Sequence, residues 1–172
     1  EPMKYFFEYN SPLGILTLEC DGEHLTGLWI EGQKYFGGAS GQTRTIANDF
    51  PVFMQTKDWL NRYFAGKRPE CSELPLAPAG TPFRRKVCNF LCDIPYGIVT
   101  SYGEIAKMVA AEMGRTTMSA QAVGGAVGHN PISIIIPCHR IVGSDGSLTG
   151  YAGGIDKKIW LLQHEGVQMN GL

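Results

Sequence analysis

The chain has 172 residues, of which 44% are hydrophobic and 18% charged, enough for one domain of average size or two small ones. No apolar run reaches the length of a membrane-spanning helix, and no basic segment precedes an apolar one near the N-terminus, so we do not expect a membrane protein. The five cysteines do not resemble a secreted disulfide framework, which favours reduced thiols in the cytoplasm.

The net charge of −1 is unevenly divided along the chain. Residues 1–80 carry seven basic and ten acidic side chains, whereas residues 81–172 carry eight basic and six acidic ones. The second half is therefore the part in which we expect an anionic partner to bind.

The first thirty residues predict three strands joined by turns. Residues 4–9, 15–18 and 25–30 are apolar or aromatic runs, and the turn signals SPLG at 11–14 and DG at 21–22 separate them. The Gly-, Ser- and Thr-rich segment that follows, residues 37–49, predicts a loop.

A helix is predicted next, from Pro51, which suits a first helical turn, to Gly66, which favours a helix end. Three prolines within residues 74–82 exclude a helix there and disfavour a strand. We therefore divide the chain into an N-terminal domain at residues 1–78, a linker at 79–81 and a C-terminal domain at 82–172.

The pattern of the C-terminal domain is helical. Residues 83–91 predict one helix, and Ser101, with a glutamate three residues later, predicts a capping box at the start of a second. Ser119 predicts the cap of a third, at residues 120–127. The second and third helices resemble a helix-turn-helix with a lengthened turn.

Gly124 and Gly125 lie next to each other in the predicted third helix, where each costs about 1 kcal/mol relative to alanine. Two explanations remain open. The backbone packs tightly against another helix, or the helix is slim enough to enter the minor groove of DNA.

A run of three isoleucines at residues 134–136 predicts a short buried strand, which Pro137 ends. Cys138 is then expected at the end of that strand, with His139 and Arg140 beside it. A free thiol is mostly protonated at neutral pH, and a neighbouring base or cation raises the ionised fraction. Cys138 is therefore a candidate nucleophile, although a Cys-His pair is also compatible with an ordinary buried thiol.

Residues 137–142 (PCHRIV) resemble the active-site motif of the O-6-alkylguanine-DNA alkyltransferases, the methylated-DNA–protein-cysteine methyltransferases. The matched region covers about residues 82–167, and the turn at 11–14 resembles the family more loosely. The resemblance implies an α+β fold with a small, strand-rich, ribonuclease-H-like N-terminal domain and a C-terminal winged helix-turn-helix domain. Four further segments match the family, namely 122–126 (AVGGA), 130–131 (NP), 151–154 (YAGG) and 161–166 (LLQHEG).

The same resemblance implies a DNA repair enzyme that acts only once. It would transfer an alkyl group, methyl foremost, from O6 of guanine to its own cysteine as a stable thioether, with O4-alkylthymine as a second candidate substrate. Because the damaged base lies inside the stack, the nucleotide would be flipped into a pocket. The implied partner is alkylated double-stranded DNA, bound through its minor groove by a monomer, with no cofactor, no metal and no membrane.

Residue roles follow from the resemblance position by position. Cys138 would be the nucleophile, His139 would take the thiol proton through a bound water, and Glu165 would orient His139. Asn130 would brace the turn that precedes the active-site strand. The positions implied at the DNA, the flipped base or its pocket are Tyr102, Gln121, Ala122, Gly124, Gly125, Arg140, Ile141, Ser144, Tyr151 and Ala152.

Three of these positions carry further expectations. Many relatives have an arginine where this chain has Gln121, and that arginine fills the gap left by the flipped base. Glutamine lacks its cation and its planar stacking surface, so we expect weaker DNA binding or slower flipping. Ala152 stands where some relatives have serine, a mild change if the backbone N–H is used. Arg140 is also expected to tie the active-site strand to a neighbouring carboxylate.

Competing functions are a non-catalytic module that binds alkylguanine, a winged-helix DNA-binding regulator and a Cys–His hydrolase. Relatives of the first kind lack the cysteine, and a hydrolase would need an oxyanion hole and would leave the Gly-Gly helix without a purpose. Cys20 and His24 resemble half of a zinc site found in some relatives, but further ligands are missing. Cys88 and Cys92 share a helix face and are expected to be buried thiols.

Overall fold

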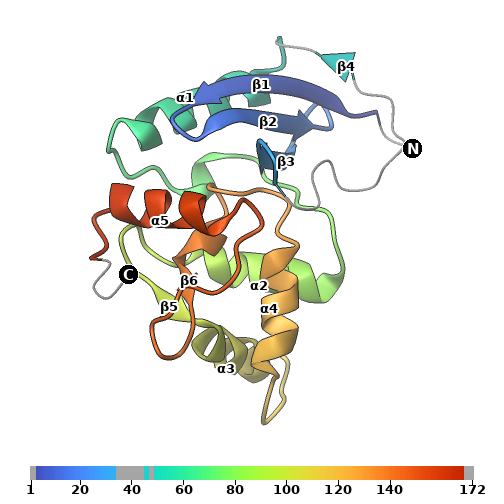
Figure 1. Cartoon of the computed structure of the whole chain (residues 1–172). Helices are drawn as coiled ribbons and strands as arrows, with labels where there is room; N and C mark the ends of the chain where they lie inside the picture. The colour runs from blue at the N-terminus through green and yellow to red at the C-terminus, as the bar shows by residue number, and fades with distance from the viewer. Residues whose placement is uncertain (1–2, 34–44, 47–48, 169–172) are drawn as a thin grey trace. The chain divides into compact units, whose positions relative to one another are not determined.

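The computed structural model describes residues 3–33, 45–46 and 49–168. These residues form two compact units. The first unit holds the chain up to Ala79 together with Pro131–Ile135, and the second holds Gly80–Asn130 and the chain from Ile136 onward. The predicted α+β class is confirmed, because the first unit is rich in strands and the second is mainly helical (Figure 1).

The first unit is built on one four-stranded sheet in the order β3-β2-β1-β4. β1 and β2 are antiparallel and turn at the Ser11↔Gly14 pair, β2 and β3 are antiparallel, and β4 is parallel to β1. The helix α1 covers one face of this sheet (Figure 1). Most of the predicted loop at 37–49 lies outside the described residues. The elements are β1 (Tyr5–Ser11), β2 (Gly14–Cys20), β3 (Leu25–Ile30), β4 (Thr45–Ile46), α1 (Pro51–Phe64) and the 3-10 helix η1 (Cys71–Glu73).

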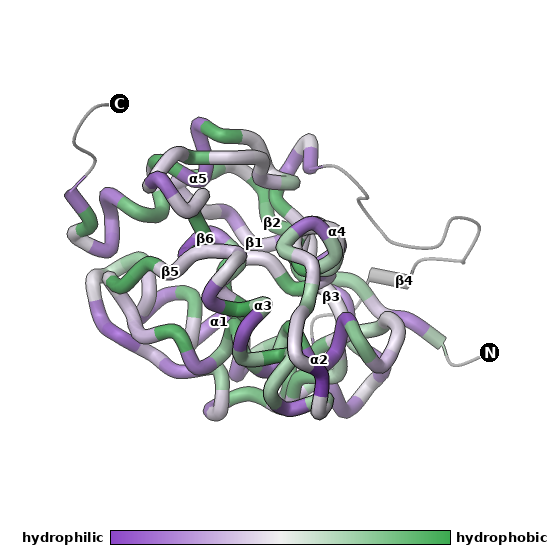
Figure 2. Tube along the Cα trace, turned by 90° about the horizontal axis from the view of Figure 1, so that it is seen from below, coloured by the Kyte–Doolittle hydropathy of each residue, from purple (hydrophilic) through white to green (hydrophobic). Residues whose placement is uncertain are grey.

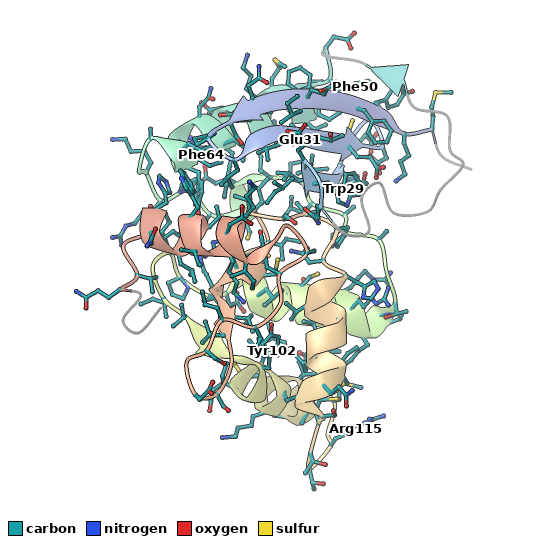
Figure 3. The ribbon with its side chains drawn as sticks, viewed as in Figure 1. Trp29, Glu31, Phe50, Phe64, Tyr102 and Arg115 are labelled. Carbon is teal, nitrogen blue, oxygen red and sulfur yellow. The ribbon has the colours of Figure 1, made fainter. Side chains whose placement is uncertain are left out.

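The core of the first unit centres on β3, all of whose residues are buried. Gly27 is required there, because a Cβ at this position would lie 2.1 Å from the ring of Trp29, which is labelled in Figure 3. The proline-rich segment also contributes to the sheet: Leu76 forms a parallel bridge with Leu25.

A second segment, Pro131–Ile135, adds to the same sheet edge. The backbone N–H of Leu28 donates to the carbonyl of Pro131 at 2.9 Å, and the N–H of Ser133 donates to Leu28 at 3.0 Å. The prediction of a strand at residues 134–136 is wrong. The chain turns there, and Ile134 has a φ of 72°. Tertiary contacts that bury all three isoleucines override their β propensity.

The second unit packs four helices with a short parallel pair of strands, β5 and β6. The predicted helix starts are confirmed: the hydroxyls of Ser101 and Ser119 accept backbone N–H groups at 3.1 and 3.2 Å. In Figure 2, hydrophilic and hydrophobic residues alternate along α2, α3 and α5, as expected for helices with one buried face. The elements are α2 (Pro82–Cys92), β5 (Thr100–Ser101), α3 (Tyr102–Glu112), α4 (Ala120–Gly128), the 3-10 helix η2 (Cys138–Arg140), β6 (Ile141–Val142) and α5 (Ile155–His164).

Within the described ranges, no helix is both long enough and apolar enough to cross a membrane.

Candidate active site

Cys138 is the first residue of η2, so its predicted place at the end of a strand is wrong. Its backbone N–H donates to Ile136 at 2.8 Å, which tightens the chain into the short helix. The residue is only 5% exposed. The side chains that act on the thiol come from separate segments of the second unit: Asn130, Tyr151 and Lys158.

These surroundings set the ionisation of the thiol. Burial raises the pKa of Cys138, because a thiolate loses hydration in a nonpolar site. Hydrogen bonding by Asn130, the positive charge of Lys158 and the side chain of Tyr151 oppose this effect but do not cancel it. The resting thiol is therefore protonated, and a base must remove its proton before it can attack.

A candidate base lies in the next residue. His139 is fully buried, and its Nε2 lies 2.7 Å from Oε2 of Glu165. Burial lowers the pKa of His139, and the adjacent carboxylate restores it only in part, so the imidazole is neutral. Because ionised Glu165 can only accept, Nε2 carries the proton and Nδ1 keeps its lone pair. Within the described part of the chain, this buried Nδ1 has no hydrogen-bond partner.

Glu165 is held by more than His139. Burial alone would raise its pKa, but His139 and Arg140 outweigh burial and hold the pKa of the carboxyl well below its ordinary value. Arg140 donates from Nε to Oε1 at 2.8 Å and from Nη2 to Oε2 at 3.1 Å. The N–H of Gly97 donates to Oε1 at 3.0 Å. Gly97 has a φ of 79°, a conformation that favours glycine.

Arg140 thus meets the carboxylate expected beside it. A third donor, Nη1, bonds to the carbonyl of Ile94 at 2.6 Å, and the guanidinium lies over the ring of Tyr96. The residue is 7% exposed. A position at the DNA, also expected from the resemblance, does not match this geometry, because the guanidinium faces groups inside the second unit.

Lys158 is the residue of this site that the sequence analysis missed. It is fully buried, and its Nζ donates to the carbonyl of Thr149 at 3.0 Å. No carboxylate in the described residues lies within ion-pair distance. Burial lowers its pKa to about 8, while the nearby Cys138 acts in the opposite direction. Its spacing from Leu161 and Leu162 on one face of α5, and from Glu165 directly after the helix, was the available signal.

The exposed face of α4 carries three of the predicted DNA-contact residues, Gln121, Ala122 and Gly125. Tight helix packing does not explain the two glycines. A Cβ at Gly124 would make ordinary contact with Tyr102 at 3.8 Å, and one at Gly125 would meet nothing within 4 Å. The backbone of α4 is therefore left open to an approaching surface.

The remaining predicted pocket residues lie at the start of α3, in β6 and in the loop after β6. Tyr102 is the first residue of α3 (Figure 3), and its hydroxyl lies 3.5 Å from that of Thr149. Ile141 is fully buried in β6, where it pairs with Thr100, so it can offer a ligand only its backbone. The others are exposed or half-buried, namely Ser144, Tyr151 and Ala152.

All five cysteines are free thiols. Within residues 3–33, 45–46 and 49–168, no group of three or more His, Cys, Asp or Glu side chains is arranged to hold a metal ion.

A cysteine next to a buried histidine–carboxylate pair characterises enzymes that attack their substrate with a thiolate. Comparison with known proteins assigns this chain to one family of such enzymes. Residues 82–167 match the DNA binding domain of 6-O-methylguanine DNA methyltransferase, and residues 4–78 match its ribonuclease-like domain. The chain belongs to the 6-O-methylguanine DNA methyltransferase family.

Individual relatives agree with this assignment. A methylated-DNA–protein-cysteine methyltransferase of Haemophilus influenzae is 40% identical over 94% of this chain and 86% of the relative. Its counterpart from Salmonella typhimurium is 51% identical over 91% and 92%. The crystal structure of Mycobacterium tuberculosis OGT in complex with DNA matches with a TM-score of 0.80 at 42% identity, covering 94% of this chain and 92% of that one.

Proposed function

We propose that this protein repairs DNA by transferring the alkyl group of O6-alkylguanine to Cys138 in a single irreversible turnover. The observation that carries the proposal is the contact of His139, the residue next to Cys138, with Glu165. This contact leaves His139 Nδ1 as a buried base. The family membership and the relatives named as methylated-DNA–protein-cysteine methyltransferases support the same activity.

The reaction begins with loss of the thiol proton. His139 Nδ1 accepts it through a water molecule, and ionised Glu165 stabilises the imidazolium that forms. Lys158 then offsets the negative charge of the thiolate. Asn130 keeps the chain before Cys138 in place, because its Nδ2 donates to the carbonyl of Ile136 at 2.9 Å.

The thiolate sulfur next attacks the alkyl carbon. A sulfur–carbon bond forms as the carbon–O6 bond breaks, and the electron pair of that bond goes to the guanine. The proton removed from the thiol passes from His139 to the guanine and balances this charge, and the hydroxyl of Tyr102 donates a hydrogen bond to the guanine. The thioether is stable, so each molecule acts once.

DNA is bound through the open face of α4, which enters the minor groove while the damaged nucleotide is flipped toward Cys138. Glycine at 124 and 125 allows the helix backbone to approach the duplex closely, and Gln121 occupies the space left by the base. The protein acts as a monomer. The free thiols suit the reducing cytoplasm, where we place the protein.

The proposal is tested with duplex DNA that carries a labelled methyl group on guanine O6. We expect one label per protein molecule, found in the tryptic peptide that contains Cys138, and no label in a Cys138→Ser variant that still binds the duplex. Binding without transfer would instead indicate a reader or regulator, and release of the label into solution would indicate a hydrolase.

Gln121→Arg is expected to tighten binding of alkylated duplex or to accelerate its repair. Arginine adds a cation and a flat surface that fits the gap in the stack, to which glutamine offers only hydrogen bonds. Dissociation constants and single-turnover rates on matched duplexes measure the change, with Gln121→Met as the uncharged control. Equal affinity and equal rates in all three proteins would contradict this role for residue 121.

A further inference from the structure

The segment before Cys138 is held by the first unit, although Cys138 itself lies in the second. The chain leaves the second unit after Asn130 and returns to it at Ile136, and these two residues are joined by the 2.9 Å bond from Asn130 Nδ2. Cys138 follows only two residues after this return. The backbone conformation of Pro131–Ile135 therefore determines where η2 begins.

Gln33 connects this segment to the end of β3. Its side-chain oxygen accepts two hydrogen bonds, one from the backbone N–H of Ile30 at 2.9 Å and one from the hydroxyl of Ser133 at 3.1 Å. Gln33 is 6% exposed and Ser133 is 1% exposed. A polar pair this deeply buried is strongly directional, because neither group finds water as a substitute partner.

Further bonds hold the segment on both sides of Ser133. Its backbone pairs with Leu28, as described above, and the thiol of Cys71 donates to the carbonyl of Ile135 at 2.9 Å. These contacts enclose Ile134, whose φ of 72° is rare for a β-branched residue. Such a conformation persists only where the surroundings impose it. Loosening the contacts would let Ile134 relax toward an ordinary backbone conformation.

We propose that Gln33 and Ser133 are positioning residues for the alkyl transfer, because their hydrogen bond keeps residues 131–135 in the strained shape from which Ile136 and Cys138 follow. The inference rests on the function proposed above. Neither residue touches the reacting atoms, so their effect falls on the rate of the chemical step. Binding of DNA by the exposed face of α4 is not expected to change.

The test compares Gln33→Met, Ser133→Ala and the double variant with the parent in single-turnover transfer from methylated duplex. At saturating DNA we expect Gln33→Met to slow transfer about tenfold, since small displacements of a nucleophile have large effects on rate. The DNA concentration at half-saturation should stay the same. The double variant should match Gln33→Met, because Gln33→Met already removes the hydrogen bond that Ser133→Ala breaks.

Thr56→Val is the matched control for a loss of stability alone. Thr56 is also fully buried in the first unit, and its hydroxyl bonds to Val52 at 2.7 Å, away from the inserted segment. This variant should unfold at a lower temperature and still transfer methyl at the parent's rate. If Gln33→Met slows transfer no more than Thr56→Val does, the positioning role is overturned.

A second readout does not depend on DNA. The rate at which iodoacetamide alkylates Cys138, measured on the tryptic peptide that contains this residue over a range of pH, reports the environment of the thiol directly. We expect the pH profile to move in Gln33→Met and not in Thr56→Val, and an unmoved profile would count against the proposal. A parent protein that fails to take methyl from DNA while this shift is present would refute the proposed function, and only the positioning of the Cys138 thiol by Gln33 would stand.

Discussion

Lys158→Met is expected to make the protein more stable and at the same time less reactive. The pKa of Lys158 is lowered from its ordinary value of 10.5 to about 8, so folding buries a charge at a net cost. Below pH 8 the lysine is protonated in both the folded and the unfolded chain, and the cost is fully present. Between pH 8 and 10.5 the folded chain loses the proton first, and the cost fades. At pH 7 the variant should gain stability on the order of 3 kcal/mol, reduced by about 1 kcal/mol for the lost hydrogen bond to Thr149.

Reactivity should change in the opposite direction. Without the ammonium group the thiolate loses the positive charge nearest to it and keeps only the hydrogen bonding of Asn130 and the side chain of Tyr151, so the pKa of Cys138 rises further. The pH profile of methyl transfer should then move to higher pH, with a loss at pH 7 of about tenfold for each unit of displacement. Thermal unfolding and single-turnover rates between pH 6 and 10 measure both effects. Lys157→Met, at the neighbouring half-buried lysine, is the control, and equal profiles for the two variants would remove this role from Lys158.

Glu165→Gln is expected to impair both stability and transfer. The change leaves the guanidinium of Arg140 buried without its counter-charge, which typically costs about 3–5 kcal/mol. His139 loses the anion that stabilises its protonated form, and transfer should slow by about a hundredfold or more. Denaturant unfolding and single-turnover rates measure the two losses. Glu112→Gln, at an exposed carboxylate paired with Lys86, should change stability by less than about 1 kcal/mol.

The contribution of Glu165 to the stability of the fold depends on pH in a defined direction. The pKa of Glu165 is lowered in the folded protein, so its stabilising effect is complete above the ordinary carboxyl range and disappears as the pH falls below it. The stability gap between the parent and Glu165→Gln should therefore narrow in acid. Adding Arg140→Met should restore part of the stability, because the lone charge is gone, without restoring transfer. Recovery of both would mean that Glu165 acts only through folding.

Local signals in the sequence predict much of this structure. The turns after β1 and β2 and the serine caps of α3 and α4 act over three or four residues, so they are visible without knowledge of the fold. Ile134 shows where such reasoning fails. Its β-branched side chain favours a strand, but contacts with residues about one hundred positions away impose a left-handed turn.

The site was predictable to a similar degree. Cys138 and His139 are adjacent in the sequence, and the family motif pointed to Glu165. Lys158 was missed because a lysine on a helix is nearly always solvated, and only its apolar neighbours one turn on hint at burial. The bonds from Gly97 and Arg140 to Glu165 also needed the structure, since they join segments that are far apart along the chain.

The excursion of Pro131–Ile135 also limits how the protein can be dissected. A fragment starting at Gly80 would retain these five residues but lose β3, to which Pro131 and Ser133 are hydrogen-bonded through Leu28. Ile132, Ile134 and Ile135, which are buried in the intact chain, would then be exposed to water a few residues before Cys138. Truncation at the apparent boundary should therefore yield a fragment that aggregates rather than an active domain.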